Sequence, residues 1–150
     1  MIVLDTNVIS EFMLPRPDAR VLDWLDHQPA SSLWTTTVTI FEVRFGLDTM
    51  PAGRRRTTLT QGFEDWLSLV VQQRILPFDE PAARRAAELS AERKRMGRSG
   101  ELRDTMIAGI VLANHATLAT RNVRHFEGIR AKVVNPWNEA GTKGLERLLG

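Results

Sequence analysis

The sequence contains no cysteine among its 150 residues. Disulfide bonds, a thiolate nucleophile and a zinc site with cysteine ligands are therefore excluded. The chain must be stabilised by a hydrophobic core instead. A domain of this length can build one, because it buries roughly two thirds of the surface that its unfolded chain exposes.

Long apolar runs are also absent. The uninterrupted apolar stretches are far shorter than the roughly 18 residues of a membrane-spanning helix. The N-terminal segment has no basic lead and reaches a carboxylate at Asp5, so we expect no secretory signal. Apolar residues make up 43% of the chain and charged residues 25%, which are ordinary globular values. These features predict one soluble, cytoplasmic domain.

A strong excess of charge is missing too, since the formal net charge is only +2. The cations are nearly all arginine, and two clusters stand out, at residues 54–56 and 93–95. Guanidinium groups match phosphate geometry, so these clusters are compatible with RNA or an acidic partner. They are equally compatible with solvated helix faces, and charge alone does not identify the function.

Short apolar runs alternate with helical periodicity along the chain. This pattern predicts a parallel sheet with helices on its faces, in an α/β fold. We expect strands near residues 2–4, 32–35, 75–78, 117–119 and 132–134. We expect helices near residues 7–13, 21–28, 38–50, 55–74, 81–96, 104–115 and 123–126. The domain should cover residues 1–137, and residues 138–150 should form a loosely attached tail.

Two aspartates are expected at element boundaries. Asp5 directly follows the first strand, which places it at the carboxyl edge of the sheet, where open parallel sheets bind ligands. Asp104 stands at the start of the helix expected at 104–115. Either residue could instead serve as a helix N-cap.

Glu42 lies within the apolar and aromatic stretch 38–45. A carboxylate in such surroundings is costly unless it is paired or bound to a metal. The alternatives are an exposed position or an ion pair with Arg44, Arg103 or Arg121.

The turn after the strand at 117–119 offers further polar groups, namely Thr120, Asn122 and His125. None of them is acidic. Asn122 could equally be an ordinary turn residue, and His125 a surface or helix-capping histidine.

Together these segments resemble the PIN-domain family, and especially its VapC-type toxins of toxin–antitoxin systems. The resemblance spans residues 1 to about 137 and implies a PIN-like three-layer sandwich, with a short central parallel sheet flanked by helices. Many members carry an aspartate in the last segment, where this chain has Asn122. The segments that carry the resemblance are Ile2–Ile9, the helix of Glu42 and Gly46, Arg103–Ala108, and Ala119–Gly128 followed by Val134–Trp137.

The resemblance implies a magnesium-dependent endoribonuclease, with Mn²⁺ as a possible substitute. Three gathered carboxylates suit a hard divalent cation, which prefers oxygen ligands. In this interpretation Asp5 and Asp104 hold the metal, directly or through water. Glu42 orients or deprotonates the attacking water.

Neighbouring polar residues receive supporting roles in the same interpretation. Asn122 or Thr120 adds a hydrogen bond near the scissile phosphate. Thr6 and Asn7 are expected to orient the carboxylate of Asp5 rather than to bind the metal.

The implied partners are an RNA substrate, a VapB-like antitoxin that enters the acidic groove, and a second copy of the chain in a homodimer. Trp24 and Trp66 are expected to be exposed aromatic residues at such contacts.

Two other functions remain open. A phosphotransferase with Asp5 as nucleophile would want a second aspartate two residues on, where the chain has Asn7. The second is a catalytically silent PIN module that binds RNA or a protein. The missing fourth acid is the observation that supports this alternative.

Overall fold

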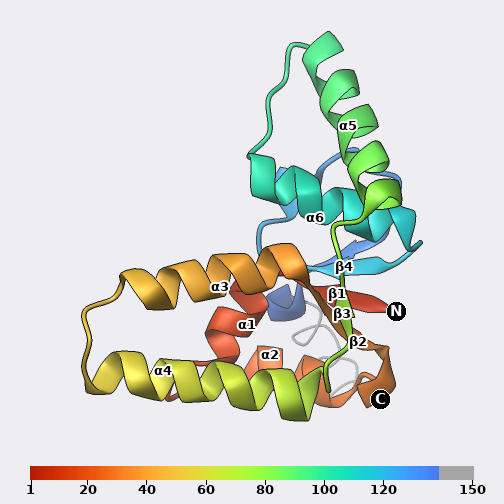
Figure 1. The fold of residues 1–150 in the computed structure, drawn as a ribbon. Coiled ribbons are helices and arrows are strands. Elements are labelled where there is room, and N and C mark those ends of the chain that lie inside the picture. Colours follow the sequence, from red (N-terminus) through yellow and green to blue (C-terminus); the bar gives the residue numbers. More distant parts are fainter. Residues whose placement is uncertain (139–150) are drawn as a thin grey trace, which may run out of the picture.

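The computed structural model describes residues 1–138. At its centre lies a five-stranded sheet in the order β3-β2-β1-β4-β5, in which all neighbouring strands are parallel (Figure 1). The predicted α/β fold is therefore confirmed. The strands are β1 (Ile2–Leu4), β2 (Leu33–Thr36), β3 (Ile75–Leu76), β4 (Thr117–Ala119) and β5 (Val133–Val134).

Helices connect the strands and cover the sheet. They are α1 (Thr6–Phe12), α2 (Ala19–Asp26), α3 (Thr37–Thr49), α4 (Arg54–Asp65), α5 (Glu80–Arg95) and α6 (Leu102–Ala113). Shorter helical turns are η1 (Ala30–Ser32), the π-helical η2 (Trp66–Val70) and η3 (Val123–Phe126).

The prediction of a single α-helix over residues 55–74 is wrong. Regular α-helix ends at Asp65, and the wider π-helical turn follows it. Gln72 and Gln73 then adopt positive φ angles of 48° and 60°, which end the helical path because side chains at successive left-handed positions cannot continue a right-handed helix.

Two hydrophobic cores lie on opposite faces of the sheet and give the molecule its three layers. Along β1, Leu4 faces the core under α1, α2, α3 and α4, and Val3 faces the core under α5 and α6. This is the alternation that a strand buried on both faces requires. Figure 1 shows α5 and α6 on one side of the strands and the other helices on the opposite side.

The two helices α5 and α6 approach each other closely at Gly109. A Cβ atom at this position would lie 2.4 Å from the carbonyl oxygen of Ala82 and 2.8 Å from the Cβ of Ala86. Glycine is therefore needed for the close packing that fixes α6 against its layer.

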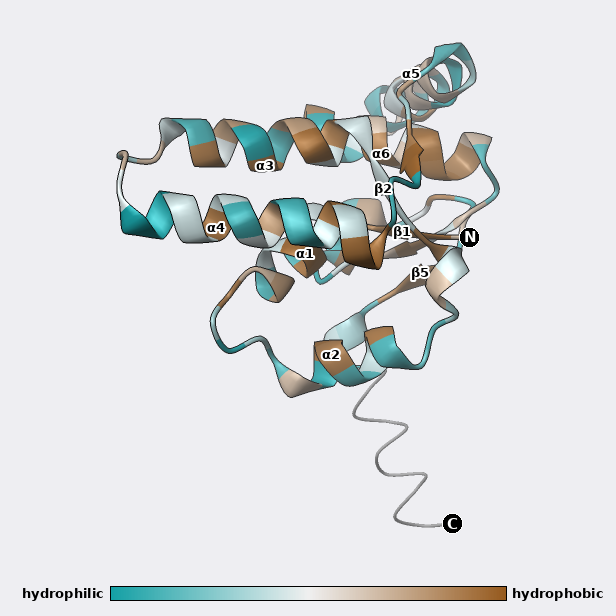
Figure 2. Ribbon diagram, turned by 60° about the horizontal axis from the view of Figure 1, so that its bottom comes forward, coloured by the Kyte–Doolittle hydropathy of each residue, from teal (hydrophilic) through white to brown (hydrophobic). Residues whose placement is uncertain are grey.

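Trp24 and Trp66 were expected to be exposed, and this prediction is wrong. Their exposed fractions are 4% and 0%, because both rings fill the core between the sheet and its covering helices. Among residues 1–138, the large exposed aromatic residues are Phe41 and Phe45 on α3, at 59% and 57%. Figure 2 shows that α3 carries both hydrophobic and hydrophilic residues along its length.

The C-terminal boundary is described only in part. Trp137 is 4% exposed and belongs to the core on the α1 side. Apart from residue 138, the tail expected at 138–150 lies outside the described residues. Within residues 1–138, no helix is both long and apolar enough to cross a membrane.

The order of the strands creates a crevice between β1 and β4. The chain builds outward from β1 through β2 to β3, and then crosses to place β4 on the other side of β1. The segment after β1 enters α1 on one face, and the segment after β4 enters η3 on the other. Ligands of open parallel sheets bind at such a switch point, outside the carboxyl ends of the strands.

Candidate active site at the carboxyl ends of the strands

A cavity of about 420 Å³ opens at this switch point. Asp5, Glu42 and Asp104 all line it, and so does Asn122. The structure thus brings together the four residues that the sequence singled out, from β1, α3, α6 and the turn after β4.

Asp5 is 3% exposed and is held by three hydrogen bonds. The backbone N–H of Thr6 donates to Oδ1 at 2.8 Å, while the Thr120 hydroxyl and the Asn7 amide donate to Oδ2 at 2.7 and 3.2 Å. Asp5 is also the N-cap of α1, so the capping role and the cavity position coexist. The expected orienting contacts of Thr6 and Asn7 are confirmed.

The surroundings of Asp5 raise the pKa of its carboxyl. Burial raises the pKa of this carboxyl, and the nearby Asp104 raises it further. The hydrogen bonds from Thr120, Thr6 and Asn7 act in the opposite direction but do not cancel the effect. A cation beside Asp5 would relieve this cost.

Thr120 and Asn7 join the ends of β1 and β4 into one network. The Thr120 hydroxyl, which is fully buried, accepts from the Asn7 side chain at 3.2 Å and from the backbone N–H of Asn122 at 3.0 Å. The Asn7 carbonyl oxygen accepts from the backbone N–H of Arg121 at 3.0 Å. The turn after β4 is therefore fixed relative to Asp5.

Glu42 points toward the cavity, with 21% of its side chain exposed. The Thr6 hydroxyl donates to Oε1 at 3.2 Å, and Nη1 of Arg103 lies 3.9 Å from Oε2. Burial raises the pKa of Glu42, the charge of Asp5 raises it further, and Arg103 lowers it in part.

The aromatic residues next to Glu42 in the sequence do not enclose it. Its neighbours Phe41 and Phe45 are exposed, so the carboxylate is not enclosed by them. Of the proposed ion-pair partners, Arg103 is near, whereas Arg44 pairs with Glu64 at 2.6 Å.

Asp104 is the third residue of α6 rather than its start. Glu101 is the N-cap, and its Oε2 accepts from the backbone N–H of Asp104 at 3.0 Å. The capping alternative for Asp104 is therefore wrong. Its carboxylate, 16% exposed, lies with Oδ2 2.7 Å from Nδ1 of His125, a pairing that the sequence did not reveal.

The turn after β4 contributes Asn122 and Arg121 to the cavity wall. The guanidinium of Arg121 lies 5.1 Å from the centre of the Trp137 ring, in a cation–π contact. Sequence reasoning identified Asn122 but missed Arg121 and Trp137 as cavity residues, together with Ser10 and Glu11. Arg121 could have been found from its place beside Asn122, whereas the others depend on the folded chain.

The donors in this cavity suit Mg²⁺ or Mn²⁺, because they are carboxylate and amide oxygens. Within residues 1–138, no three Asp, Glu or His side chains are gathered closely enough to enclose an ion by themselves. Mg²⁺ does not need such a cage, since it usually keeps several waters and binds through one or two carboxylates. The pKa values of Asp5 and Glu42 are raised by burial and by neighbouring carboxylates. A bound cation would offset both effects, so this site is compatible with positive charge.

A parallel α/β sheet with acidic residues at its switch point defines the class of this protein. The PIN domain family matches residues 2–132, and the chain belongs to this family.

Three relatives are similar over almost their whole lengths. Plasmid stability protein StbB of Pseudomonas syringae pv. tomato is 42% identical over 91% of this chain and 99% of its own. VapC ribonuclease Y4jK of Sinorhizobium fredii is 41% identical over 93% of this chain and 100% of its own. Toxin FitB of Neisseria gonorrhoeae is 34% identical over 93% of this chain and 100% of its own.

A solved structure shows the same fold. FitAcB from Neisseria gonorrhoeae superimposes with a TM-score of 0.82 and 35% identity, covering 91% of this chain and 99% of that one.

Proposed function

We propose that this chain is a Mg²⁺-dependent endoribonuclease, with Mn²⁺ as an alternative ion, and the toxin of a toxin–antitoxin pair. The observation that carries the proposal is the convergence of Asp5, Glu42 and Asp104 on one cavity at the switch point of the sheet. The similarity to a protein named VapC ribonuclease and to one named Toxin FitB supports it. The cytoplasm is its proposed site of action, because cellular RNA is the proposed substrate.

Asp5 and Asp104 would hold the metal, directly or through water. A divalent cation there would supply positive charge to the phosphoryl oxygens and make a bound water more acidic. Asp5 suits this role because Thr6, Asn7 and Thr120 fix both of its oxygens.

Glu42 would orient the attacking water or accept its proton. Its Oε1 is held by the Thr6 hydroxyl, and its raised pKa brings it closer to the range in which a carboxylate is an effective base. Asn122, which lines the same cavity, would donate its amide to the phosphate, and Thr120 would act through Asp5 rather than on the RNA.

The proposed protein partners are a VapB-like antitoxin and a second copy of the chain. A basic side chain of the antitoxin would compete with the cation among the three carboxylates, because charge complementarity favours both. Phe41 and Phe45, whose rings stack with centres 6.2 Å apart, replace the buried tryptophans as candidates for an apolar contact in the dimer. Light scattering should show a dimer. A monomer at all concentrations would contradict the proposed homodimer.

The decisive experiment compares RNA cleavage by the wild type and by Asp5→Asn and Asp104→Asn, in Mg²⁺ and in EDTA. Asp26→Asn, at an exposed position on α2, is the matched control. We expect cleavage by the wild type and the control in Mg²⁺ only, and none by the site variants. If the wild type binds RNA but does not cleave it with Mg²⁺ or Mn²⁺, the chain is a silent PIN module.

A further inference from the structure

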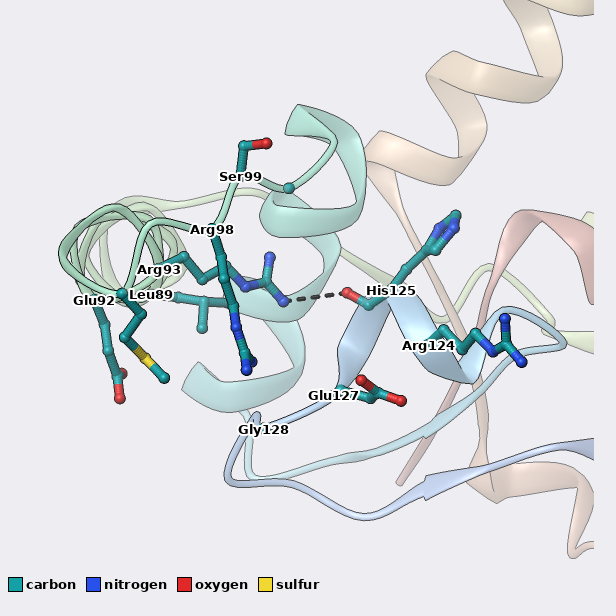
Figure 3. Close-up of a pocket in the computed structure, with 11 residues that line it drawn as sticks. Leu89, Glu92, Arg93, Arg98, Ser99, Arg124, His125, Glu127 and Gly128 are labelled. Atoms are coloured by element: carbon teal, nitrogen blue, oxygen red, sulfur yellow. Dashed lines mark hydrogen bonds between the residues drawn. The ribbon is translucent and has the colours of Figure 1, made fainter.

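A second cavity, of about 250 Å³, lies where the C-terminal end of α5 meets η3 (Figure 3). It is built from two segments that are separate in the sequence, residues 89–100 and residues 124–128. The lining residues are Leu89, Glu92, Arg93, Met96, Arg98, Ser99, Gly100, Arg124, His125, Glu127 and Gly128.

Three arginines line the cavity, Arg93 and Arg98 from the first segment and Arg124 from the second. Arg93 is fixed, since Nη1 donates to the Thr105 hydroxyl at 3.3 Å and Nη2 to the backbone oxygen of His125 at 3.1 Å (Figure 3). The basic cluster at residues 93–95 therefore does not act as one unit, because only its first member lines the cavity.

The other two arginines are available to a ligand. Among residues 1–138, no hydrogen bond or ion pair engages the guanidinium of Arg98 or of Arg124. Glu92 and Glu127 also line the cavity, but within the same residues neither forms an ion pair with an arginine. Figure 3 shows the Arg124 side chain directed away from Arg93 and Arg98, so the unpaired guanidinium beside the hollow is that of Arg98. A guanidinium group can bind a phosphate in a bidentate manner.

This arginine-lined cavity adjoins the carboxylate cavity. His125 lines the first, and its Nδ1 lies 2.7 Å from Oδ2 of Asp104, which lines the second. The His125 side chain is 55% exposed, so the surface between the two cavities is open to solvent.

The carboxylate cavity alone is poorly suited to hold a polyanion. Asp5, Glu11, Glu42 and Asp104 line it, and Arg121 is the one cationic residue that lines it among residues 1–138. An RNA strand whose reacting phosphate lies near Asp104 carries further phosphates on both sides. Cationic groups beyond the carboxylates are needed to hold those phosphates in register.

We infer that the arginine-lined cavity binds a backbone phosphate of the RNA strand, close to the phosphate that is cleaved. This inference rests on the proposed ribonuclease function and adds to it the site that positions the substrate. The contact is with the phosphate, so it is independent of base sequence.

The first test measures binding of a single-stranded RNA of mixed sequence in EDTA, across a series of salt concentrations. The variant is Arg98→Gln/Arg124→Gln, and the control is Arg95→Gln, which removes an exposed arginine of α5 that lines neither cavity. Loss of one phosphate contact should weaken binding and reduce the slope of log affinity against log salt by about 0.7. The control should keep the wild-type slope, and thermal unfolding should show all three proteins folded.

The second test identifies which phosphate of the RNA the cavity binds. In an RNA that the wild type cleaves, each phosphate in turn is replaced by a neutral methylphosphonate. One position near the cleavage site should weaken binding to the wild type, and the same replacement should have no effect on the double variant. If several positions matter equally in both proteins, the cavity does not hold a particular phosphate.

The outcomes separate this inference from the function on which it rests. If the wild type cleaves RNA with Mg²⁺ but the double variant keeps the wild-type salt slope, the phosphate site is wrong and the ribonuclease stands. If RNA binding is unchanged while binding of the protein partner weakens, the cavity receives an acidic segment of that partner and the inference is overturned. If the wild type cleaves no RNA with Mg²⁺ or Mn²⁺, the proposed function itself fails.

Discussion

The hydroxyl of Thr120 donates a 2.7 Å hydrogen bond to Oδ2 of Asp5, and it joins the ends of two adjacent parallel strands. Asp5 is 3% exposed and Thr120 is fully buried, so water cannot replace this donor. The same hydroxyl accepts two further hydrogen bonds, from Asn7 and from the backbone of Asn122. The orientation of the Asp5 carboxylate therefore depends on a residue 115 positions away.

Thr120→Val should reduce Mg²⁺-dependent cleavage, because it keeps the size of the side chain but frees the Asp5 carboxylate to turn. Loss of a residue that orients a metal ligand lowers metal affinity or activity by about 10- to 100-fold. Thr120→Ser retains the hydroxyl and should restore most of the activity. Cleavage rates measured against Mg²⁺ concentration should show a higher Mg²⁺ requirement for the valine variant, and an unchanged requirement would contradict the positioning role.

Glu42→Gln should lower single-turnover cleavage by about 10²- to 10⁴-fold, the usual contribution of a general base, while RNA binding changes little. Burial and the charge of Asp5 raise the pKa of Glu42, so the deprotonated base should be lost already above the ordinary value of 4.5 as pH falls. This acid limb of the rate profile should disappear in the variant. Glu88→Gln on the exposed face of α5 is the control.

A different result would assign Glu42 a structural role. If RNA binding collapses while the single-turnover rate survives, the contact with Arg103 is what matters at this position.

The stability of the metal-free protein should decrease as pH rises through the raised pKa of Asp5. Burial raises this pKa in the folded state, so the folded protein binds the proton more tightly than the unfolded chain does. The resulting stabilisation is complete below the ordinary value of 3.8 and is lost above the raised one. Urea unfolding in EDTA should show this loss for the wild type and a weaker pH dependence for Asp5→Asn.

At neutral pH without metal, Asp5→Asn should be at least as stable as the wild type, since it removes a buried charge close to Asp104. A large drop in stability would mean that the network of Asp5 is structural.

Two glycine substitutions should affect stability in opposite directions. Gly109→Ala places a Cβ against Ala82 and Ala86 at the contact of α5 with α6, and should destabilise the fold by about 1–3 kcal/mol. Gly46→Ala on α3 meets nothing within 4 Å and should be neutral or stabilise by up to about 1 kcal/mol. Urea denaturation of both variants measures the difference, and equal effects would contradict the close packing of α5 on α6.

The sequence was sufficient to predict the sheet, its covering helices and the acidic residues that meet at its edge. Asp5 could be placed because it directly follows an apolar strand. Asp104 was misplaced within its helix because Glu101, a less common cap, begins α6 earlier. Trp24 and Trp66 were misjudged because an amphipathic pattern shows that one helix face is buried without showing how deeply.

The second cavity could not have been found in this way. Arg93 and Arg98 line one cavity with Arg124 only because α5 packs on α6 and η3 folds back against them. In the sequence they are ordinary members of an arginine-rich chain.

Calorimetric titration with Mn²⁺ tests the central claim most directly, because it measures the metal site without any RNA. The wild type should bind Mn²⁺, Asp5→Asn and Asp104→Asn should bind it far more weakly, and Asn122→Asp should bind it more tightly because it adds a carboxylate to the same cavity. Asp26→Asn should match the wild type. Equal Mn²⁺ affinity in the wild type, Asp5→Asn and Asp104→Asn would contradict the claim that these carboxylates form a metal site.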